Sequence, residues 1–94
     1  MWSHVDQSYT KPYFLCIQGM VTLWDADEGD ATLLVHEGSN NVHKAFGKKF
    51  GITDKSNWYK INSDEQYEFM ADYPQVCVKA KAGSLILWDS RTCH

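Results

Sequence analysis

The sequence predicts one small β-rich α+β domain of 94 residues, with strands near both ends and short helices in the middle. Runs of β-forming residues stand at 13–24 and 84–88, and a helix-capping pattern stands between them at 63–66. The hydrophobic share of 44% and the aromatic share of 14% are sufficient for a core and too high for a disordered chain. We therefore expect a single domain spanning 1–94.

The first half of the chain is predicted to be β structure interrupted by turns. Residues 1–9 have the alternation of a strand end, and Pro12 breaks it because proline has no N–H to donate to a ladder. Residues 13–24 are apolar on both alternating faces, which predicts a central strand. An acidic turn at 25–30 leads to a further strand at 31–36, so a hairpin-like pair is expected here.

Helical signals occupy the middle of the chain, and β character returns after them. Spacing over 42–50 predicts one helix, and Ser63 with Gln66 forms a capping box that opens a second. Strand alternation resumes at 75–79 and at 84–88. Strands on both sides of the helices predict long-range pairing between the two ends of the chain.

Composition excludes several classes of function. The net charge is −3 and the lysines and arginines are scattered, so no basic stripe is available for nucleic acid. Three widely separated cysteines without a C-x-x-C pair argue against a disulfide framework and a thiolate zinc site. The sequence has neither a signal segment nor an apolar run of about 18 residues. We expect a soluble, cytoplasmic protein that acts on a small molecule, with no prediction of its oligomeric state.

Ligand-type side chains stand at both ends of the chain. His4 and Asp6 are two positions apart, so a strand places them on one face while Val5 points to the other. His94 follows the last apolar run. Two imidazoles and one carboxylate on one side of a metal form the facial triad of non-haem Fe(II) oxygenases. We predict a metal site of His4, Asp6 and His94, with no catalytic residue beyond these ligands. Two histidines without a carboxylate at this spacing are predicted to be structural, namely His36 and His43.

Four ordered blocks of the sequence resemble a known family. The blocks are His4-Val5-Asp6, the acidic turn closing on Gly29, Thr32 to Val35 leading to Gly38-Ser39, and the segment from Gly83 to His94. Together they are similar to the phytanoyl-CoA dioxygenase-like family of Fe(II)/2-oxoglutarate-dependent oxygenases. The resemblance implies a double-stranded β-helix, also called a jelly roll or cupin-type barrel, with one or two short inserted helices. It also implies that His4, Asp6 and His94 hold the iron.

The resemblance further implies a reaction. Iron, 2-oxoglutarate and O2, with ascorbate as a supporting reductant, would hydroxylate a C–H bond of a small organic or lipid-like substrate. A carboxylate at Asp6 indicates a hydroxylase, because relatives that bind a halide instead have a small residue there. Gln18 and Thr32 are candidates for hydrogen bonds to the cosubstrate, and Tyr13 and Trp88 are candidates for lining the substrate pocket.

One feature of the family has no counterpart in the sequence. The family carries a basic residue beyond the distal histidine that pairs with a carboxylate of 2-oxoglutarate, and the sequence stops at His94. Arg91 matches an arginine in the turn before that histidine and is not given this role. We therefore expect a barrel truncated before its last strand and weak turnover by these residues alone. Two alternatives remain open, a non-catalytic jelly-roll binding module and a cupin-like metalloenzyme that does not use 2-oxoglutarate.

Overall fold

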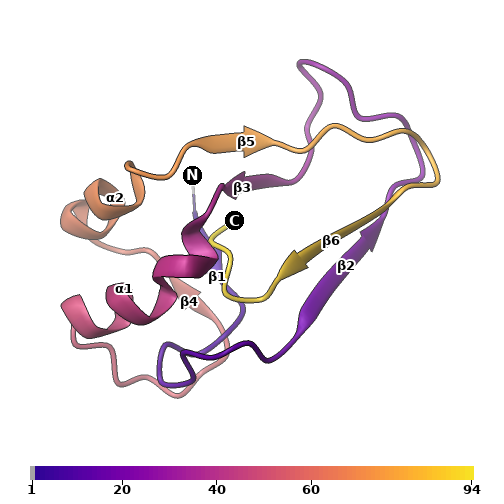
Figure 1. The fold of residues 1–94 in the computed structure, drawn as a ribbon. Helices are drawn as coiled ribbons and strands as arrows, with labels where there is room; N and C mark the ends of the chain where they lie inside the picture. Colours follow the sequence, from indigo (N-terminus) through magenta and orange to yellow (C-terminus); the bar gives the residue numbers. More distant parts are fainter. Residues whose placement is uncertain (1) are drawn as a thin grey trace.

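A computed structural model describes residues 2–94, which form short antiparallel strand pairs and two α-helices (Figure 1). The strands are β1 (His4–Val5), β2 (Ile17–Val21), β3 (Leu34–His36), β4 (Tyr59–Lys60), β5 (Gln75–Cys77) and β6 (Leu85–Asp89). The helices are the 3-10 turn η1 (Ser39–Val42), α1 (His43–Lys49) and α2 (Asp64–Met70). The predicted β-rich α+β class is confirmed. Within residues 2–94 the pairs β1–β4, β2–β6 and β3–β5 do not close into a barrel.

Two of the pairs belong to one folded ribbon. The β2–β6 pair begins with Ile17 opposite Asp89, and the β3–β5 pair is nested inside it. A bridge between Ala26 and Ala80 connects the two pairs. Figure 1 shows the ribbon bending back at the end far from the helices, so that β2–β6 and β3–β5 form its two arms.

The expected hairpin between 13–24 and 31–36 is wrong. The acidic segment is paired with a later part of the chain instead of turning back on itself. Its Ala26 N–H donates to the Ala80 carbonyl at 2.8 Å. Each strand therefore pairs with a partner from the last quarter of the chain. The expectation of a central strand is also wrong, since within residues 2–94 β2 forms a two-stranded sheet with β6 alone.

The helices and the strand pair β1–β4 enclose the core, at the opposite end from the bend. The Ser63 hydroxyl accepts from the Gln66 N–H at 3.2 Å, and the Gln66 side chain accepts from the Asn62 N–H at 3.1 Å. The predicted cap of α2 is thus confirmed, with the return bond made one residue earlier than in a standard capping box. The buried apolar side chains are Val5, Tyr9, Phe46, Ile61, Met70 and Cys93.

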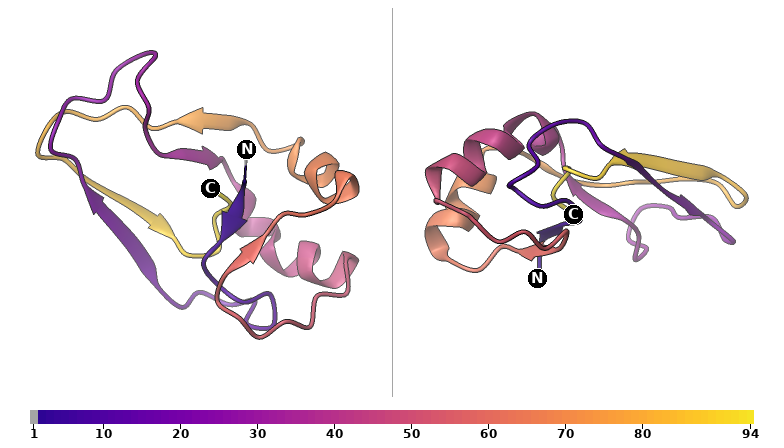
Figure 2. Two further views of the ribbon diagram at one scale, coloured as in Figure 1. Left: turned by 180° about the vertical axis from the view of Figure 1, so that it is seen from behind. Right: turned by 90° about the horizontal axis from the view of Figure 1, so that it is seen from below.

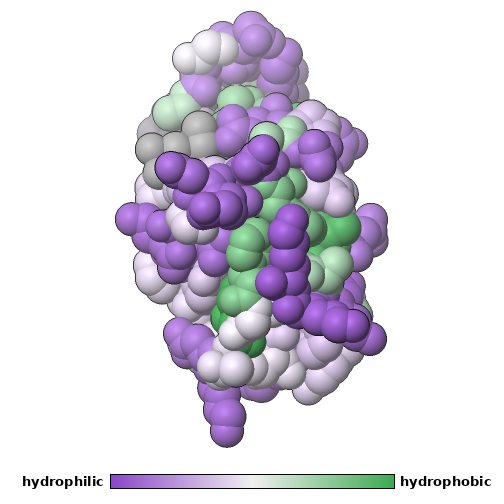
Figure 3. Space-filling view, turned by 90° about the vertical axis from the view of Figure 1, so that its left-hand side faces the viewer, coloured by the Kyte–Doolittle hydropathy of each residue, from purple (hydrophilic) through white to green (hydrophobic). Residues whose placement is uncertain are grey.

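Tyr9 is the aromatic centre of this core. Its ring stacks on His43 at 4.4 Å and on Phe46 at 4.9 Å between centroids. Gly47 allows the close approach of α1, because a Cβ at position 47 would lie 2.9 Å from the Tyr9 Cβ. Seen from this end, polar side chains surround a smaller apolar area (Figure 3).

The two ends of the chain pair with each other. His4 N–H donates to the His94 carbonyl at 2.9 Å, and His94 N–H donates back to the His4 carbonyl at 2.9 Å. On its other side β1 pairs with β4, with His4 opposite Lys60. Figure 2 shows both termini beside β1, between the helices and the ribbon. The predicted long-range pairing of the two ends is confirmed.

The ribbon exposes many apolar side chains. Ile17 is 52% exposed and Leu87 is 59% exposed, although both lie on hydrogen-bonded strands. Other large exposed apolar side chains of the ribbon and its approach are Tyr13, Phe14, Leu15, Met20, Val21, Leu23, Trp24, Val76 and Leu85. In residues 2–94 no helix has the length and apolar character needed to cross a bilayer.

Candidate metal centre

The three predicted ligands lie together between the helical core and the ribbon. One ligand atom from each of His4, Asp6 and His94 lies within 4.8 Å of the other two. Asp6 Oδ2 is 3.2 Å from His94 Nε2 and 3.7 Å from His4 Nε2. All three side chains are partly buried, so a metal there would lose some but not all contact with solvent.

The backbone explains this convergence. His4 lies on β1 and Asp6 follows two residues later on the same face, while Val5 points into the core with 1% exposure. His4 and His94 exchange both backbone hydrogen bonds, and residues paired in this way carry their side chains on one face. The two imidazole centroids are 4.4 Å apart.

Backbone carbonyls orient both imidazoles. His94 Nδ1 lies 2.9 Å from the Thr92 carbonyl, and His4 Nδ1 lies 3.4 Å from the Trp2 carbonyl. A carbonyl oxygen only accepts, so these contacts favour a proton on Nδ1, the tautomer that leaves the Nε2 lone pair available to a metal. Both Nε2 atoms face Asp6, as metal ligands require.

The spacing fits a divalent metal. Ligand atoms about 2.1 Å from a metal and at right angles to each other are about 3 Å apart. The two separations from Asp6 Oδ2, 3.2 and 3.7 Å, are close to that value, and all three ligand atoms lie within 4.8 Å of one another, so small side-chain movements would bring them to a common metal. Two neutral imidazoles and one carboxylate suit iron and similar metals, and their position on one side leaves further coordination positions open.

Gln18 contacts the carboxylate from β2. Its side-chain Nε2 donates to Asp6 Oδ2 at 2.8 Å. The Gln18 Oε1 atom is buried, and no residue between 2 and 94 donates to it. The structure therefore places Gln18 beside a ligand, and its predicted bond to the cosubstrate stays a prediction.

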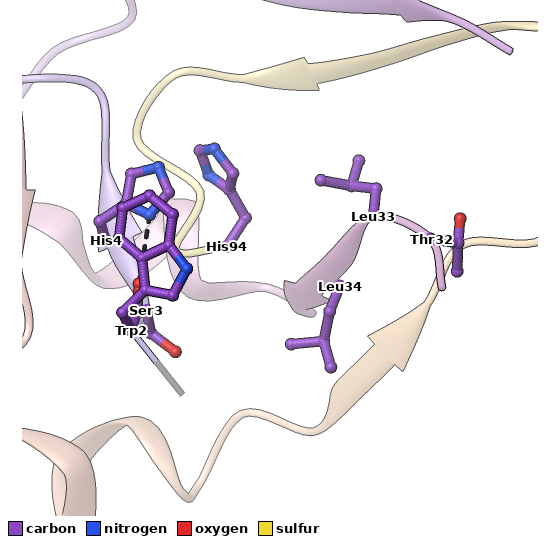
Figure 4. Close-up of a pocket in the computed structure, with 7 residues that line it drawn as sticks. All are labelled: Trp2, Ser3, His4, Thr32, Leu33, Leu34 and His94. Carbon is purple, nitrogen blue, oxygen red and sulfur yellow. Dashed lines mark hydrogen bonds between the residues drawn. The ribbon is translucent and has the colours of Figure 1, made fainter. Parts of the chain in front are cut away.

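A hollow of about 340 Å³ opens beside the imidazoles (Figure 4). Figure 4 shows the Trp2, His4 and His94 rings on one side of it and the Leu33 and Leu34 side chains on the other. Trp2 stacks on His4 with centroids 4.8 Å apart and planes at 17°. The lining residues are Trp2, Ser3, His4, Thr32, Leu33, Leu34 and His94.

Of the other predicted site residues, Thr32 lines the hollow, whereas Trp88 and Tyr13 do not. The Thr32 hydroxyl donates to the Val78 carbonyl at 2.6 Å. Trp88 meets the His94 ring edge-on at 5.4 Å, and its indole N–H is buried without an acceptor from residues 2–94. Tyr13 does not line the hollow, and it is 57% exposed in the loop before β2.

Arg91 is engaged within its own turn. Its Nε and Nη2 atoms donate to the two carboxylate oxygens of Asp89 at 3.0 and 2.6 Å. The guanidinium group lowers the pKa of Asp89, and the carboxylate raises the pKa of Arg91. The guanidinium group is thus already paired, and its exclusion as the partner of a cosubstrate carboxylate stays a prediction.

The two remaining histidines support the fold. His36 Nδ1 lies 3.2 Å from the Tyr73 carbonyl, and His43 Nε2 lies 3.2 Å from the Gln7 carbonyl. Both imidazoles are buried, and burial lowers the pKa of His43. Neither belongs to the three-residue cluster, as the sequence predicted.

Comparison with known proteins finds one distant relative. The chain is 26% identical over 102 aligned positions to "Ava biosynthesis cluster protein O" from Aspergillus versicolor. The alignment covers 99% of the chain and 33% of that protein, so the chain spans about a third of its relative's length. No family model matches the sequence, and no solved structure matches it.

Sequence reasoning missed the apolar lining of the hollow. Trp2, His4 and Asp6 occur at every second position, and this alternation is a signal that could have placed Trp2 on the ligand face. No pattern in the sequence predicted that Leu33 and Leu34 line the hollow, because their position depends on how the ribbon bends toward the N-terminal strand.

Proposed function

We propose that residues 1–94 form the metal-binding part of a non-haem Fe(II)/2-oxoglutarate-dependent dioxygenase of the phytanoyl-CoA dioxygenase-like family. Its reaction would hydroxylate a C–H bond of a small organic or lipid-like substrate. The observation that carries the proposal is the convergence of His4, Asp6 and His94, whose ligand atoms lie within 4.8 Å of one another. The name of the relative, a biosynthesis cluster protein, supports a small-molecule substrate.

The strand arrangement supports a jelly-roll interpretation. The β3–β5 pair is nested within the β2–β6 pair along one bent antiparallel ribbon. Jelly rolls are built from antiparallel strands that wrap in this way, with sites at the mouth of the barrel. We propose that the ribbon is part of a double-stranded β-helix and that the metal ligands lie at its mouth.

Each residue of the site has a defined task in this proposal. His4 and His94 each offer a neutral Nε2 atom, and the Thr92 and Trp2 carbonyls hold the rings in place. Asp6 adds a negative charge that offsets part of the metal's charge, and Gln18 holds its carboxylate. Iron, 2-oxoglutarate and O2 would together supply the oxidation, with one oxygen atom entering the substrate and the other entering succinate as CO2 is released.

A second candidate is a cupin-like metalloenzyme that does not use 2-oxoglutarate. Its support is that, within residues 2–94, no lysine or arginine lines the hollow beside the imidazoles. Arg91, the cation nearest in sequence to His94, is paired with Asp89. This candidate keeps the same metal ligands and differs in the cosubstrate.

Succinate formation separates these candidates. The full-length protein is given Fe(II), ascorbate, O2 and 2-oxoglutarate, and succinate is measured alongside calorimetric metal binding. Asp6→Ala and Asp6→Asn should both lose metal affinity and succinate formation while the circular dichroism spectrum is retained. Asp72→Asn, at an exposed carboxylate beyond α2, is the matched control and should leave both unchanged.

Metal binding and succinate formation together discriminate between the three candidate functions. Metal binding without succinate, in a protein supplied with all cosubstrates, would favour the cupin-like candidate. A protein that binds no metal would favour the non-catalytic binding module. Full succinate formation by both Asp6 variants would make the His4-Val5-Asp6 motif a chance match.

A further inference from the structure

The hollow beside the imidazoles is lined mainly by apolar and aromatic side chains. We propose that it holds the organic substrate and selects a small, uncharged, largely apolar molecule with a planar ring system. This inference rests on the proposed function, because it assigns a substrate class to the same metal site. Its volume of about 340 Å³ lies at the lower end of the usual range for small-molecule sites.

The position of the hollow connects it to the metal ligands. His4 and His94 belong to both the hollow and the three-residue cluster, so a molecule in the hollow contacts the imidazoles directly. Asp6 is absent from the lining, so only the two imidazoles of the cluster are exposed to the hollow. Figure 4 shows the leucine side chains facing the rings across the hollow.

Charge decides which kind of molecule fits. The described residues that line the hollow include no lysine, arginine, aspartate or glutamate. Its two hydroxyl groups already have partners, since Thr32 donates to the Val78 carbonyl at 2.6 Å and Ser3 Oγ lies 3.4 Å from His36 Nε2. A carboxylate placed here would lose much of its hydration without gaining a lysine or arginine partner. The hollow is therefore unsuited to the distal end of 2-oxoglutarate and suited to an uncharged substrate.

The aromatic wall indicates the shape of the occupant. Trp2 is 60% exposed although it stacks on His4, so much of its indole surface stays open. Trp58 is tilted against the same pair, with centroids 6.2 Å from Trp2 and 5.9 Å from His4. Flat unsaturated rings gain from stacking on such surfaces, and branched aliphatic side chains complete the opposite wall.

The test uses indole as the probe and NMR as the readout. Saturation-transfer difference measures indole binding with or without metal. Mn(II), a paramagnetic substitute for Fe(II), should broaden the resonances of indole held beside the imidazoles. We expect both signals in the wild-type protein, and glutarate, a dicarboxylate of similar size, should give no saturation transfer in the metal-free protein.

Matched variants locate the binding site. Leu34→Glu places a carboxylate in the hollow and should weaken indole binding by at least about tenfold. Leu85→Glu places the same charge at an exposed position of β6 outside the hollow and should leave binding unchanged. Trp2→Ala, at an exposed side chain, tests the aromatic wall if Leu34→Glu does not fold, and should also weaken binding.

Failures of the two proposals are distinguishable. Indole that binds equally well to Leu34→Glu and Trp2→Ala, or does not bind at all, would overturn the assignment of the hollow. Indole that binds without Mn(II) broadening, in a protein that does bind Mn(II), would place it elsewhere and overturn the assignment too. A protein that does not bind Mn(II) would instead refute the proposed function, while saturation transfer still tests the apolar hollow.

Discussion

The Gln18 amide donates a 2.8 Å hydrogen bond to Asp6 Oδ2, the oxygen that also faces both imidazoles. Groups that hold a metal ligand in place contribute to affinity without touching the metal. Gln18→Leu should therefore weaken metal binding by about 10- to 100-fold, measured by calorimetric titration with Mn(II).

The control for this variant is Thr22→Val. It removes a hydrogen bond to the Lys81 carbonyl elsewhere on the same ribbon and should leave metal affinity unchanged. Equal affinity in the wild-type and Gln18→Leu proteins would mean that Asp6 needs no support from β2.

Stability should fall at mildly acidic pH because of His43. Burial lowers its pKa, Arg91 acts in the same direction, and the Gln7 carbonyl and Asp89 oppose them. Since the folded pKa lies below the unfolded value, the unfolded chain takes up the proton first. The free energy of unfolding should therefore decrease as the pH falls through about 6.5, by at most about 1.4 kcal/mol per pH unit from this group.

Urea unfolding at several pH values measures this effect. His43→Gln should flatten the dependence between about pH 7.5 and about pH 5.5, whatever its own effect on stability. Parallel curves for the variant and the wild-type protein would show that His43 titrates alike in the folded and unfolded chains.

Gly47 should not tolerate a methyl group. Alanine favours a helix over glycine by about 1 kcal/mol, but here its Cβ would lie 2.9 Å from the Tyr9 Cβ. Gly47→Ala should lower the free energy of unfolding by roughly 1 to 3 kcal/mol in urea denaturation. Lys48→Ala, at the next and exposed position of α1, is the control, and a stabilised Gly47→Ala would mean that Tyr9 moves aside.

The apolar ribbon should promote self-association. Leu87 and Ile17 are more than half exposed on adjacent strands, and exposed apolar patches with free strand edges favour contact with another chain. Leu87→Lys should raise the dissociation constant at least about tenfold in sedimentation experiments, because burial of a leucine contributes roughly 1.5 to 3 kcal/mol. Asn41→Lys adds the same charge away from the ribbon, and an equal effect of both variants would point to net charge instead.

The parts of the structure that follow local rules could be predicted from the sequence. The cap at Ser63 depends on residues three apart, and the shared face of His4 and Asp6 depends on strand alternation. The meeting of His4 with His94 followed from the ligand chemistry of two imidazoles and a carboxylate, which a single metal brings together.

Features that depend on distant partners could not be predicted. The pairing of β2 with β6 depends on contacts between strands far apart in sequence. The local turn signal at Gly29 instead suggested that β2 pairs with the next strand, which is wrong. The short strand β4 lies in a polar segment without alternation. The apolar run at 13–24 predicted a central strand, but Trp24 at its end is 78% exposed because nothing in residues 2–94 covers that part of the ribbon.

The backbone pairing of His4 with His94 makes metal binding and folding a linked equilibrium. In an unfolded chain His4 and Asp6 remain neighbours, but His94 is separated from them by nearly the whole sequence, and bringing it back costs loop-closure entropy. A metal held by all three groups therefore binds the folded chain and not the unfolded one. Each tenfold rise in free metal above the dissociation constant then adds about 1.4 kcal/mol to the free energy of unfolding. Opening the two hydrogen bonds between the chain ends would release the ion, so the ion acts as a removable cross-link.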